Sequence, residues 1–172
     1  MADKKKYAFL MIRFNTPDII KDIQEQLSED DLYYGDDSRS GYGIETDTHV
    51  TLVPCLDNDV DLNKLKDMLE PLDKYQTFLT NISSFDNPDF EVLKCDASSI
   101  PLFNSYKAIT DKYPTHSDYK EYHPHATIAY VKHGVAEKYT KDVLDKLIVL
   151  EPKEFWFSYY DKNGNEKEVT WK

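Results

Sequence analysis

Two short segments with the same pattern stand far apart in the chain: a histidine and a threonine separated by one residue, then an apolar residue. They are His49 to Leu52 and His125 to Ile128. Successive side chains of a β-strand point to opposite faces, so in a strand the histidine and threonine of each segment share a face. Two histidines can divide the roles of proton acceptor and proton donor, and two hydroxyls can donate hydrogen bonds to phosphate oxygens. The two segments therefore predict metal-free cleavage of a phosphodiester.

At these residues the sequence resembles the two-histidine (2H), LigT-like phosphoesterase superfamily, whose mark is a pair of His-x-Thr/Ser-apolar motifs on strands of two pseudo-symmetric lobes. The resemblance implies a bilobal α+β fold, with two antiparallel sheets flanked by helices around a central cleft. It also implies a catalytic tetrad of His49, Thr51, His125 and Thr127, and no cofactor. The motif spacing, 125 minus 49 or 76 residues, suits two lobes of similar size. Two unrelated half-buried histidines on strands are the alternative interpretation.

The rest of the sequence predicts the elements that must position these side chains. Apolar and aromatic runs predict strands, and apolar residues at helical spacing predict helices. The expected strands are 7–14, 48–53, 77–85, 90–95, 124–131, 154–160 and 166–171, and the expected helices are 17–27, 61–72, 100–113 and 136–147. In the last helix, Tyr139, Val143, Leu144 and Leu147 are expected to face the core. This order predicts one mixed α+β domain over residues 1–172.

Local signals mark several of these boundaries. Thr16 is expected as the N-cap of the helix that Pro17 begins, and Asp61 as the cap of the second helix. Asn163-Gly164 suits the positive φ angles of a tight hairpin turn. Residues 28–48, rich in Asp, Ser and Gly, are expected to form a loop with a short strand at 32–34. This loop could cover the site or be a plain surface connection.

The composition is acidic, because 32 Asp and Glu against 21 Lys and Arg give a net charge of -11. Duplex nucleic acid is bound mainly by neutralising its phosphates, so this charge argues against it as a partner and disfavours a small phosphate ester less. Cys55 and Cys95 show no metal-binding spacing and are expected to be buried thiols. The apolar run at 7–12 is too short for a secretory signal or a membrane span. We expect a soluble cytoplasmic monomer, in the host cytoplasm if viral, with no membrane partner.

Residues beside the motifs and at strand ends are candidates for binding the substrate. Bases stack on aromatic faces, and a guanidinium binds phosphate through its planar set of donors. The candidates are Tyr7, Tyr34, Tyr122, Trp156 and Arg39. Arg13, at the end of the first strand, could also reach an anionic substrate, although either arginine could be a plain surface residue.

His123 and His125 form a His-x-His pair, which raises the alternative of a metal site. A catalytic zinc site needs three protein ligands. Thr127 stands where a third alternating histidine would be, and no further Cys or His follows at a useful spacing. The sequence therefore predicts no metal site. His116, His123 and His133 are expected at the surface or behind the site.

The predicted activity is hydrolysis of small nucleotide phosphodiesters, cyclic or 2′-5′ linked, by a metal-independent 2H-type hydrolase. The compact acidic chain without an RNA-recognition domain resembles the phage enzymes that destroy the cyclic oligonucleotide signals of antiviral defence, the anti-CBASS branch. One alternative is a phosphodiesterase of 2′,3′-cyclic phosphates or 2′-5′ oligonucleotides in RNA processing. The other is an acidic, tyrosine-rich module that binds a nucleotide or a protein without catalysis.

Overall fold

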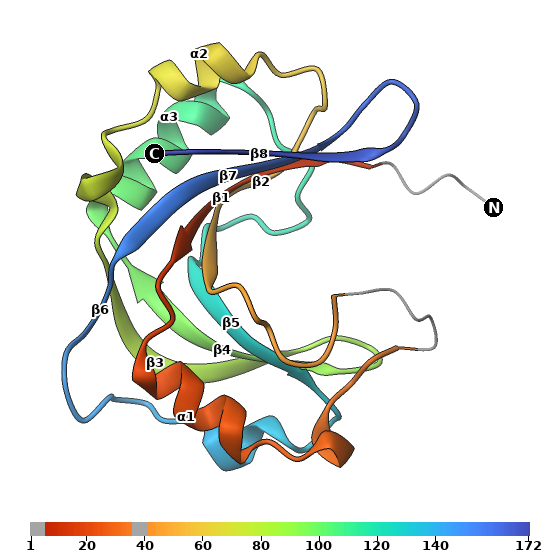
Figure 1. The fold of residues 1–172 in the computed structure, drawn as a ribbon, viewed down its shortest axis with the longest axis vertical. Coiled ribbons are helices and arrows are strands. Elements are labelled where there is room, and N and C mark those ends of the chain that lie inside the picture. The colour runs from red at the N-terminus through yellow and green to blue at the C-terminus, as the bar shows by residue number, and fades with distance from the viewer. Residues whose placement is uncertain (1–5, 36–40) are drawn as a thin grey trace.

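The computed structural model describes residues 6–35 and 41–172, in which eight strands form one antiparallel sheet in the order β6-β3-β4-β5-β2-β1-β7-β8. The strands are β1 (Ala8–Phe14), β2 (His49–Leu56), β3 (Thr77–Asp86), β4 (Glu91–Ser98), β5 (His125–Val131), β6 (Ile148–Leu150), β7 (Pro152–Tyr160) and β8 (Glu166–Trp171). The sheet is strongly curved, so that β7 and β8 lie in one arm and β3 to β5 in the other, around a concave inner face (Figure 1). The expected α+β class is confirmed.

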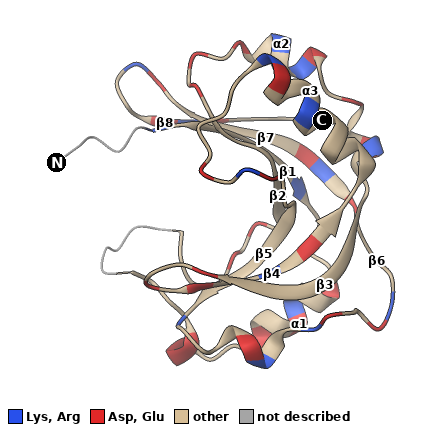
Figure 2. Cartoon of the chain, turned by 180° about the vertical axis from the view of Figure 1, so that it is seen from behind, with Lys and Arg blue, Asp and Glu red and all other residues tan. Residues whose placement is uncertain are grey.

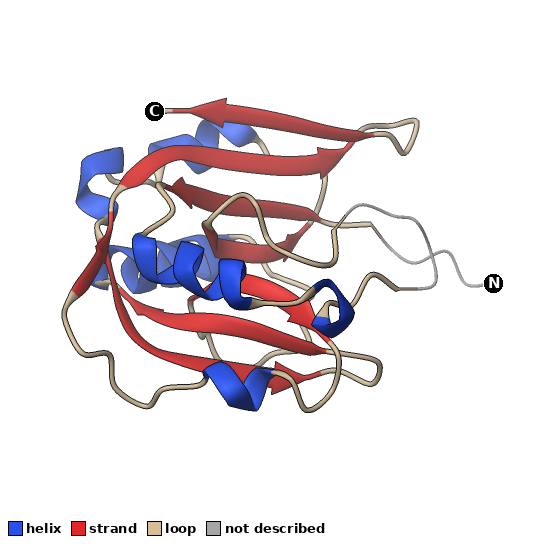
Figure 3. Cartoon of the chain, turned by 60° about the horizontal axis from the view of Figure 1, so that its bottom comes forward, coloured by secondary structure: helices blue, strands red, loops and turns tan. Residues whose placement is uncertain are grey.

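The helices cover the convex outer face of the sheet (Figures 1 and 3). They are α1 (Asp18–Gln26), α2 (Leu62–Asp67) and α3 (Ile100–Lys112), with short 3-10 turns η1 (Glu29–Asp31), η2 (Leu72–Tyr75) and η3 (Ala136–Tyr139). α3 packs against β2 and α1 against β5. Val50, Leu52 and Ala126 are fully buried in the core. Each Val or Leu side chain removed from water in this way contributes about 1.5–3 kcal/mol to stability.

The two halves of the sheet meet at a single residue pair, Val50 with Ala126, between β2 and β5. Beyond this pair the two strands diverge, and loops take their place. The backbone N–H of Tyr130 on β5 donates to the carbonyl of Gly43 over 2.8 Å, and the N–H of His116 donates to the carbonyl of Cys55 on β2 over 3.0 Å. The expected arrangement of two separate sheets is therefore not confirmed, because this one pair joins all eight strands.

Most predicted elements are present with boundaries shifted by a few residues, and two of the predicted helices are not as expected. The helix expected at 61–72 ends at Asp67, and η2 follows after Pro71. The prediction of a helix at 136–147 is wrong, because only the short η3 turn at Ala136–Tyr139 is helical there. Lys141 exchanges two backbone hydrogen bonds of 2.9 Å with Ile82 of β3, which holds the chain extended. Val143 and Leu147, expected in the core, are 77% and 72% exposed.

The local signals at the element ends are partly confirmed. Asp61 caps α2 by accepting hydrogen bonds from the next turn, and Gly164 has a φ of +76° in the β7–β8 turn. Thr16 does not cap α1: its hydroxyl bonds the hydroxyl of Thr48 over 2.8 Å, and Pro17 takes the cap position. The strand expected at 32–34 is a single bridge from Leu32 to β5.

Neither cysteine is in a disulfide, and burial raises the pKa of the Cys95 thiol to about 12. Among the residues that the structure describes, no helix has the length and apolar character to cross a membrane. Most Asp and Glu residues lie in the helices and loops, while the strands at the centre of the sheet carry only isolated charged positions (Figure 2).

Candidate active site

The β2–β5 pair brings the two motifs together on the sheet. Because β2 and β5 are antiparallel, His49 and Thr127 flank the Val50–Ala126 pair on one side, and Thr51 and His125 flank it on the other. Val50 and Ala126 point into the core, so these four side chains share the opposite, concave face. Each histidine thus neighbours the threonine of the other motif.

Both histidine rings are anchored in the same way. Nδ1 of His49 lies 2.7 Å from the carbonyl oxygen of Asp47, and Nδ1 of His125 lies 2.9 Å from the carbonyl oxygen of His123. A carbonyl oxygen only accepts hydrogen bonds, so Nδ1 carries the hydrogen in each ring. The Nε2 atom of each neutral imidazole therefore holds the lone pair and can accept a proton.

The strands next to the motif strands place three charged side chains beside the tetrad. On β1, Arg13 stands opposite His49. On β4, Lys94 stands opposite Thr127, and Asp96 stands opposite His125. Directly opposite residues of an antiparallel pair lie on the same face of the sheet, so these three side chains share the concave face with the tetrad.

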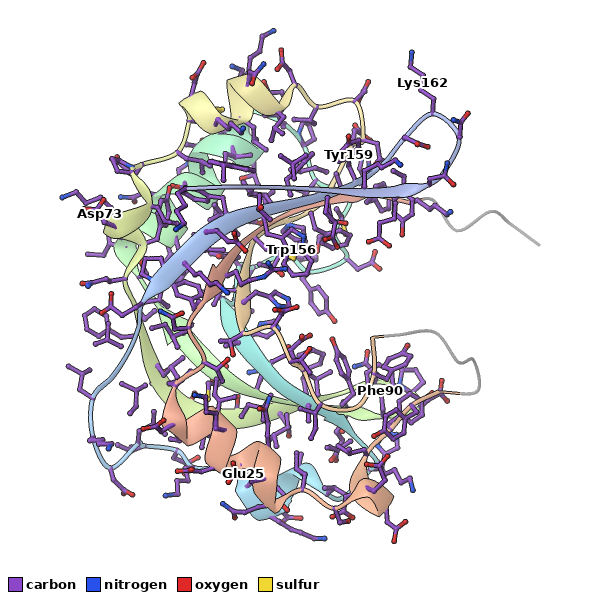
Figure 4. The ribbon with its side chains drawn as sticks, viewed as in Figure 1. Glu25, Asp73, Phe90, Trp156, Tyr159 and Lys162 are labelled. Carbon is purple, nitrogen blue, oxygen red and sulfur yellow. The ribbon has the colours of Figure 1, made fainter. Side chains whose placement is uncertain are left out.

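Arg13 is held by an ion pair and an aromatic ring. Its Nη1 donates to Oε1 of Glu154 over 2.6 Å, and its guanidinium carbon lies 4.3 Å from the centre of the Trp156 ring. The Trp156 ring also meets His49 edge to face, with centroids 5.5 Å apart. Figure 4 shows Trp156 on the inner side of the curved sheet. This ring therefore positions both Arg13 and His49.

Lys94 and Asp96 form an ion pair beside the second motif, and both also bond the Ser83 hydroxyl on β3. Burial alone would raise the pKa of Asp96, but the hydrogen bond and charge of Lys94 hold it below its usual range. Burial lowers the pKa of His125, and Lys94 lowers it further, against the hydrogen bond to the His123 carbonyl. His125 is thus favoured in its neutral form.

The predicted substrate-binding residues have different surroundings. Trp156 lies beside the tetrad with Arg13 over its ring. Tyr122 donates its hydroxyl to the carbonyl of Thr51 over 2.9 Å and stacks on Tyr106 of α3, with centroids 4.2 Å apart. Tyr122 therefore supports the first motif from the α3 side.

Two further predicted residues, Tyr7 and Tyr34, make contacts with residues outside the tetrad. Tyr7 stacks on His116 with centroids 4.9 Å apart. Tyr34 is 47% exposed, and its hydroxyl donates to Glu29 over 2.7 Å. Arg39 lies outside the described residues.

The structure also contains an aromatic cluster that the sequence did not indicate. Tyr33, Tyr42, Phe90 and Tyr130 form a cluster with ring centroids 4.9 to 5.8 Å apart. Figure 4 shows Phe90 on the inner side of the lower arm, near the opening between the arms. Strict alternation along β5 would put Tyr130 on the core face. A bulge corrects this, because Tyr130 pairs with Val92 and Thr127 with Lys94, two residues apart on β4.

The His-x-His alternative finds no support in the side-chain geometry. The exposed His123 ring faces Glu121, with Nε2 3.4 Å from its carboxylate, while His125 is turned to the His123 backbone. A group with metal-binding atoms within 4.8 Å of one another does occur elsewhere, at Asp86, Glu91 and His133. The Glu91 carboxylate there already accepts two backbone N–H groups.

Comparison with known proteins relates this chain to another at the level of the fold. No protein-family model and no curated protein matches the sequence. Among solved structures, E. coli LigT in its apo form is similar, with a TM-score of 0.52 over 98% of this chain and 96% of LigT. The two sequences are 11% identical. The chain thus has an α+β fold like that of E. coli LigT, a curved antiparallel sheet with few helices.

Proposed function

We propose that this protein is a 2H-type phosphodiesterase that hydrolyses small nucleotide phosphodiesters without a metal. The observation that carries the proposal is the block of His49, Thr127, Thr51 and His125 on one face of the sheet, with both histidine rings anchored through Nδ1. The fold, which is similar to that of E. coli LigT, supports the same proposal independently of the two motifs.

The tetrad contains the groups that hydrolysis of a phosphodiester requires. One neutral Nε2 takes a proton from the attacking water as its oxygen bonds to phosphorus. The other histidine, protonated at Nε2, gives its proton to the leaving ribose oxygen as the phosphorus–oxygen bond breaks. The hydroxyls of Thr51 and Thr127 donate to the non-bridging oxygens, where negative charge accumulates. The products are a phosphomonoester and a free hydroxyl.

The surroundings favour His125 as the base. Burial and the charge of Lys94 lower its pKa, so it stays neutral at pH values where an ordinary histidine begins to gain a proton. His49 then gives its proton to the leaving oxygen. In the reverse reaction His49 accepts the proton and His125 donates it.

Among nucleotide phosphodiesters, the proposed substrates are the cyclic oligonucleotide signals of antiviral defence, which a phage enzyme would destroy. The net charge of -11 disfavours long polyanions, so stacking and enclosure are expected to supply a large part of the binding energy. The aromatic cluster of Tyr33, Tyr42, Phe90 and Tyr130 supports this, because it offers ring surface on the arm that carries the second motif. RNA with 2′,3′-cyclic phosphate ends and linear 2′-5′ oligonucleotides are the competing substrates.

A panel of cyclic oligonucleotides, 2′-5′ oligonucleotides and 2′,3′-cyclic nucleotides tests the proposal, with products followed by mass spectrometry. Wild type is expected to turn over at least one member, and His49→Ala and His125→Ala are expected to lose at least about 100-fold in kcat, the usual contribution of an acid or base. His123→Ala is the matched control, since it keeps the backbone carbonyl that anchors His125. Binding of a nucleotide without turnover by wild type would instead favour a non-catalytic module.

A further inference from the structure

Two basic side chains lie on the concave face, one on each side of the tetrad. Arg13 is next to His49, and Lys94 is next to Thr127. His49 and Thr127 both flank the single β2–β5 pair on the same side. The order across four neighbouring strands is therefore Lys94, Thr127, His49, Arg13. The other row of the block, through His125 and Thr51, is flanked by an acid and an apolar side chain, Asp96 and Met11.

Both cations are held in place and still have unused donors. Arg13 is 18% exposed, and within the described residues its one hydrogen bond runs from Nη1 to Glu154. A guanidinium has five N–H donors. Lys94 is 12% exposed and donates to Ser83 and Asp96, so one of its three N–H donors is still unused. Held donors with spare N–H bonds suit a phosphate, because little conformational freedom is lost on binding.

The surroundings of Arg13 are not those expected of a purely structural ion pair. Its Nε is buried without a hydrogen-bond partner, 3.7 Å from the nearest carboxylate oxygen of Asp47. Nε1 of Trp156, under the guanidinium, is also buried without a partner. Leaving buried donors unpaired costs stability, and such groups occur preferentially where a structure serves a function. Arg13 and Trp156 thus each hold a donor beside His49 that no described group of the chain pairs.

The spacing of the strands indicates what the two cations can reach. Neighbouring strands lie about 4.8 Å apart, so each cation stands one strand beyond a motif strand. A phosphate cleaved between the two histidines leaves Arg13 on one side and Lys94 on the other. In an oligonucleotide the next phosphate lies one sugar away in each direction. In a chain of net charge -11, each additional phosphate requires a local positive charge to offset repulsion.

We infer that Arg13 and Lys94 bind the phosphates on either side of the scissile one, so that the site selects oligonucleotides with consecutive phosphodiesters over nucleotides with a single cyclic phosphate. This inference rests on the proposed function and identifies the substrate class of that site. Arg13 and Lys94 are then specificity-determining residues.

Steady-state kinetics on two probes test the inference. Cyclic triadenylate carries three phosphodiesters, and 2′,3′-cyclic adenosine monophosphate carries one. Arg13→Gln and Lys94→Gln are expected to lower kcat/KM for cyclic triadenylate roughly 10- to 100-fold, the effect of losing a hydrogen bond to a charged group. The loss on the mononucleotide should be at least about tenfold smaller. Lys66→Gln is the matched control, because this lysine lies over an aromatic ring too, 4.5 Å from the centre of Trp171, and comes from α2 on the outer face; it should change neither value.

Each single variant leaves the carboxylate of its ion pair without a partner, which could destabilise the fold. Double variants that remove both charges of a pair control for this effect. Arg13→Gln with Glu154→Gln, and Lys94→Gln with Asp96→Asn, remove both charges of a pair, and thermal melting checks that each variant folds. The same preference for larger losses on cyclic triadenylate is expected from the double variants.

Equal losses of kcat/KM on the two probes, or no loss on cyclic triadenylate, would overturn the inference. The proposed function would still stand in that case, provided that the wild type turns the probes over. If wild type hydrolyses neither probe, the proposed function fails for these substrates. Titration calorimetry then decides the inference separately. The variants must weaken binding of cyclic triadenylate more than binding of the mononucleotide, and absence of triadenylate binding to wild type also refutes it.

Discussion

The hydroxyl of Tyr122 is expected to hold the first motif strand in position, and Tyr122→Phe removes this hydroxyl alone. The hydroxyl donates a hydrogen bond to the carbonyl of Thr51 over 2.9 Å. Thr51 lies on β2, which pairs with β5 only at Val50 and Ala126. Burial raises the pKa of Tyr122, so the hydroxyl is a neutral donor. The phenylalanine keeps the stacking of the ring on Tyr106, with centroids 4.2 Å apart.

The magnitude follows from the loss of one hydrogen bond in a partly buried place. A buried acceptor left without its partner costs about 1–3 kcal/mol. In a domain of this size, 1 kcal/mol lowers Tm by about 2–4 °C. With a central cost of about 1.5 kcal/mol, Tm should fall by roughly 3–6 °C. Because Thr51 then loses a backbone anchor, kcat should fall severalfold, whereas KM should change little.

Scanning calorimetry measures Tm, and the best substrate of the panel gives kcat and KM. Tyr106→Phe is the matched control, because it keeps the stacked rings and leaves the hydrogen bond to Thr51 in place. An unchanged Tm together with a raised KM would refute this account of Tyr122 and show that its side chain contacts the substrate, as the sequence alone suggested.

The remaining predictions concern pH, the hydroxyls, metal and the misassigned helix. Lys94→Met removes a charge that lowers the pKa of His125, so the acid limb of the kcat/KM profile should move to higher pH; an unchanged limb would assign it to another group. Thr51→Ala and Thr127→Ala should each lower kcat by up to about 100-fold, with serine at either position retaining most activity. Activity should survive EDTA, and loss that zinc or manganese restores would contradict a metal-free mechanism. Val143→Ser should change the free energy of unfolding by less than about 0.5 kcal/mol in urea denaturation, because this side chain is 77% exposed.

The elements around the motifs could be predicted from the sequence because their signals are local. The apolar and aromatic run before Thr16 forms β1, Asp61 caps α2, and Gly164 permits the turn between β7 and β8. Alternation along a strand also predicts that the histidine and threonine of each motif share a face. None of these signals depends on residues distant in the chain.

The helix expected at 136–147 shows where local signals fail. Its apolar residues have helical spacing, but Lys141 bonds the backbone of Ile82 in both directions, 59 residues earlier (141 minus 82). A strand edge that needs hydrogen-bond partners prevails over a modest helical preference. Sequence periodicity contains no information about that edge.

Tertiary structure alone decides which side chains surround the tetrad, because strand register between distant segments is set by long-range pairing. One pair, Val50 with Ala126, places each histidine next to the threonine of the other motif. The registers of β1 and β4 place Arg13 and Lys94 beside the tetrad. The sequence thus identifies the side chains that could perform the chemistry, whereas the pairing of distant strands determines which side chains surround them.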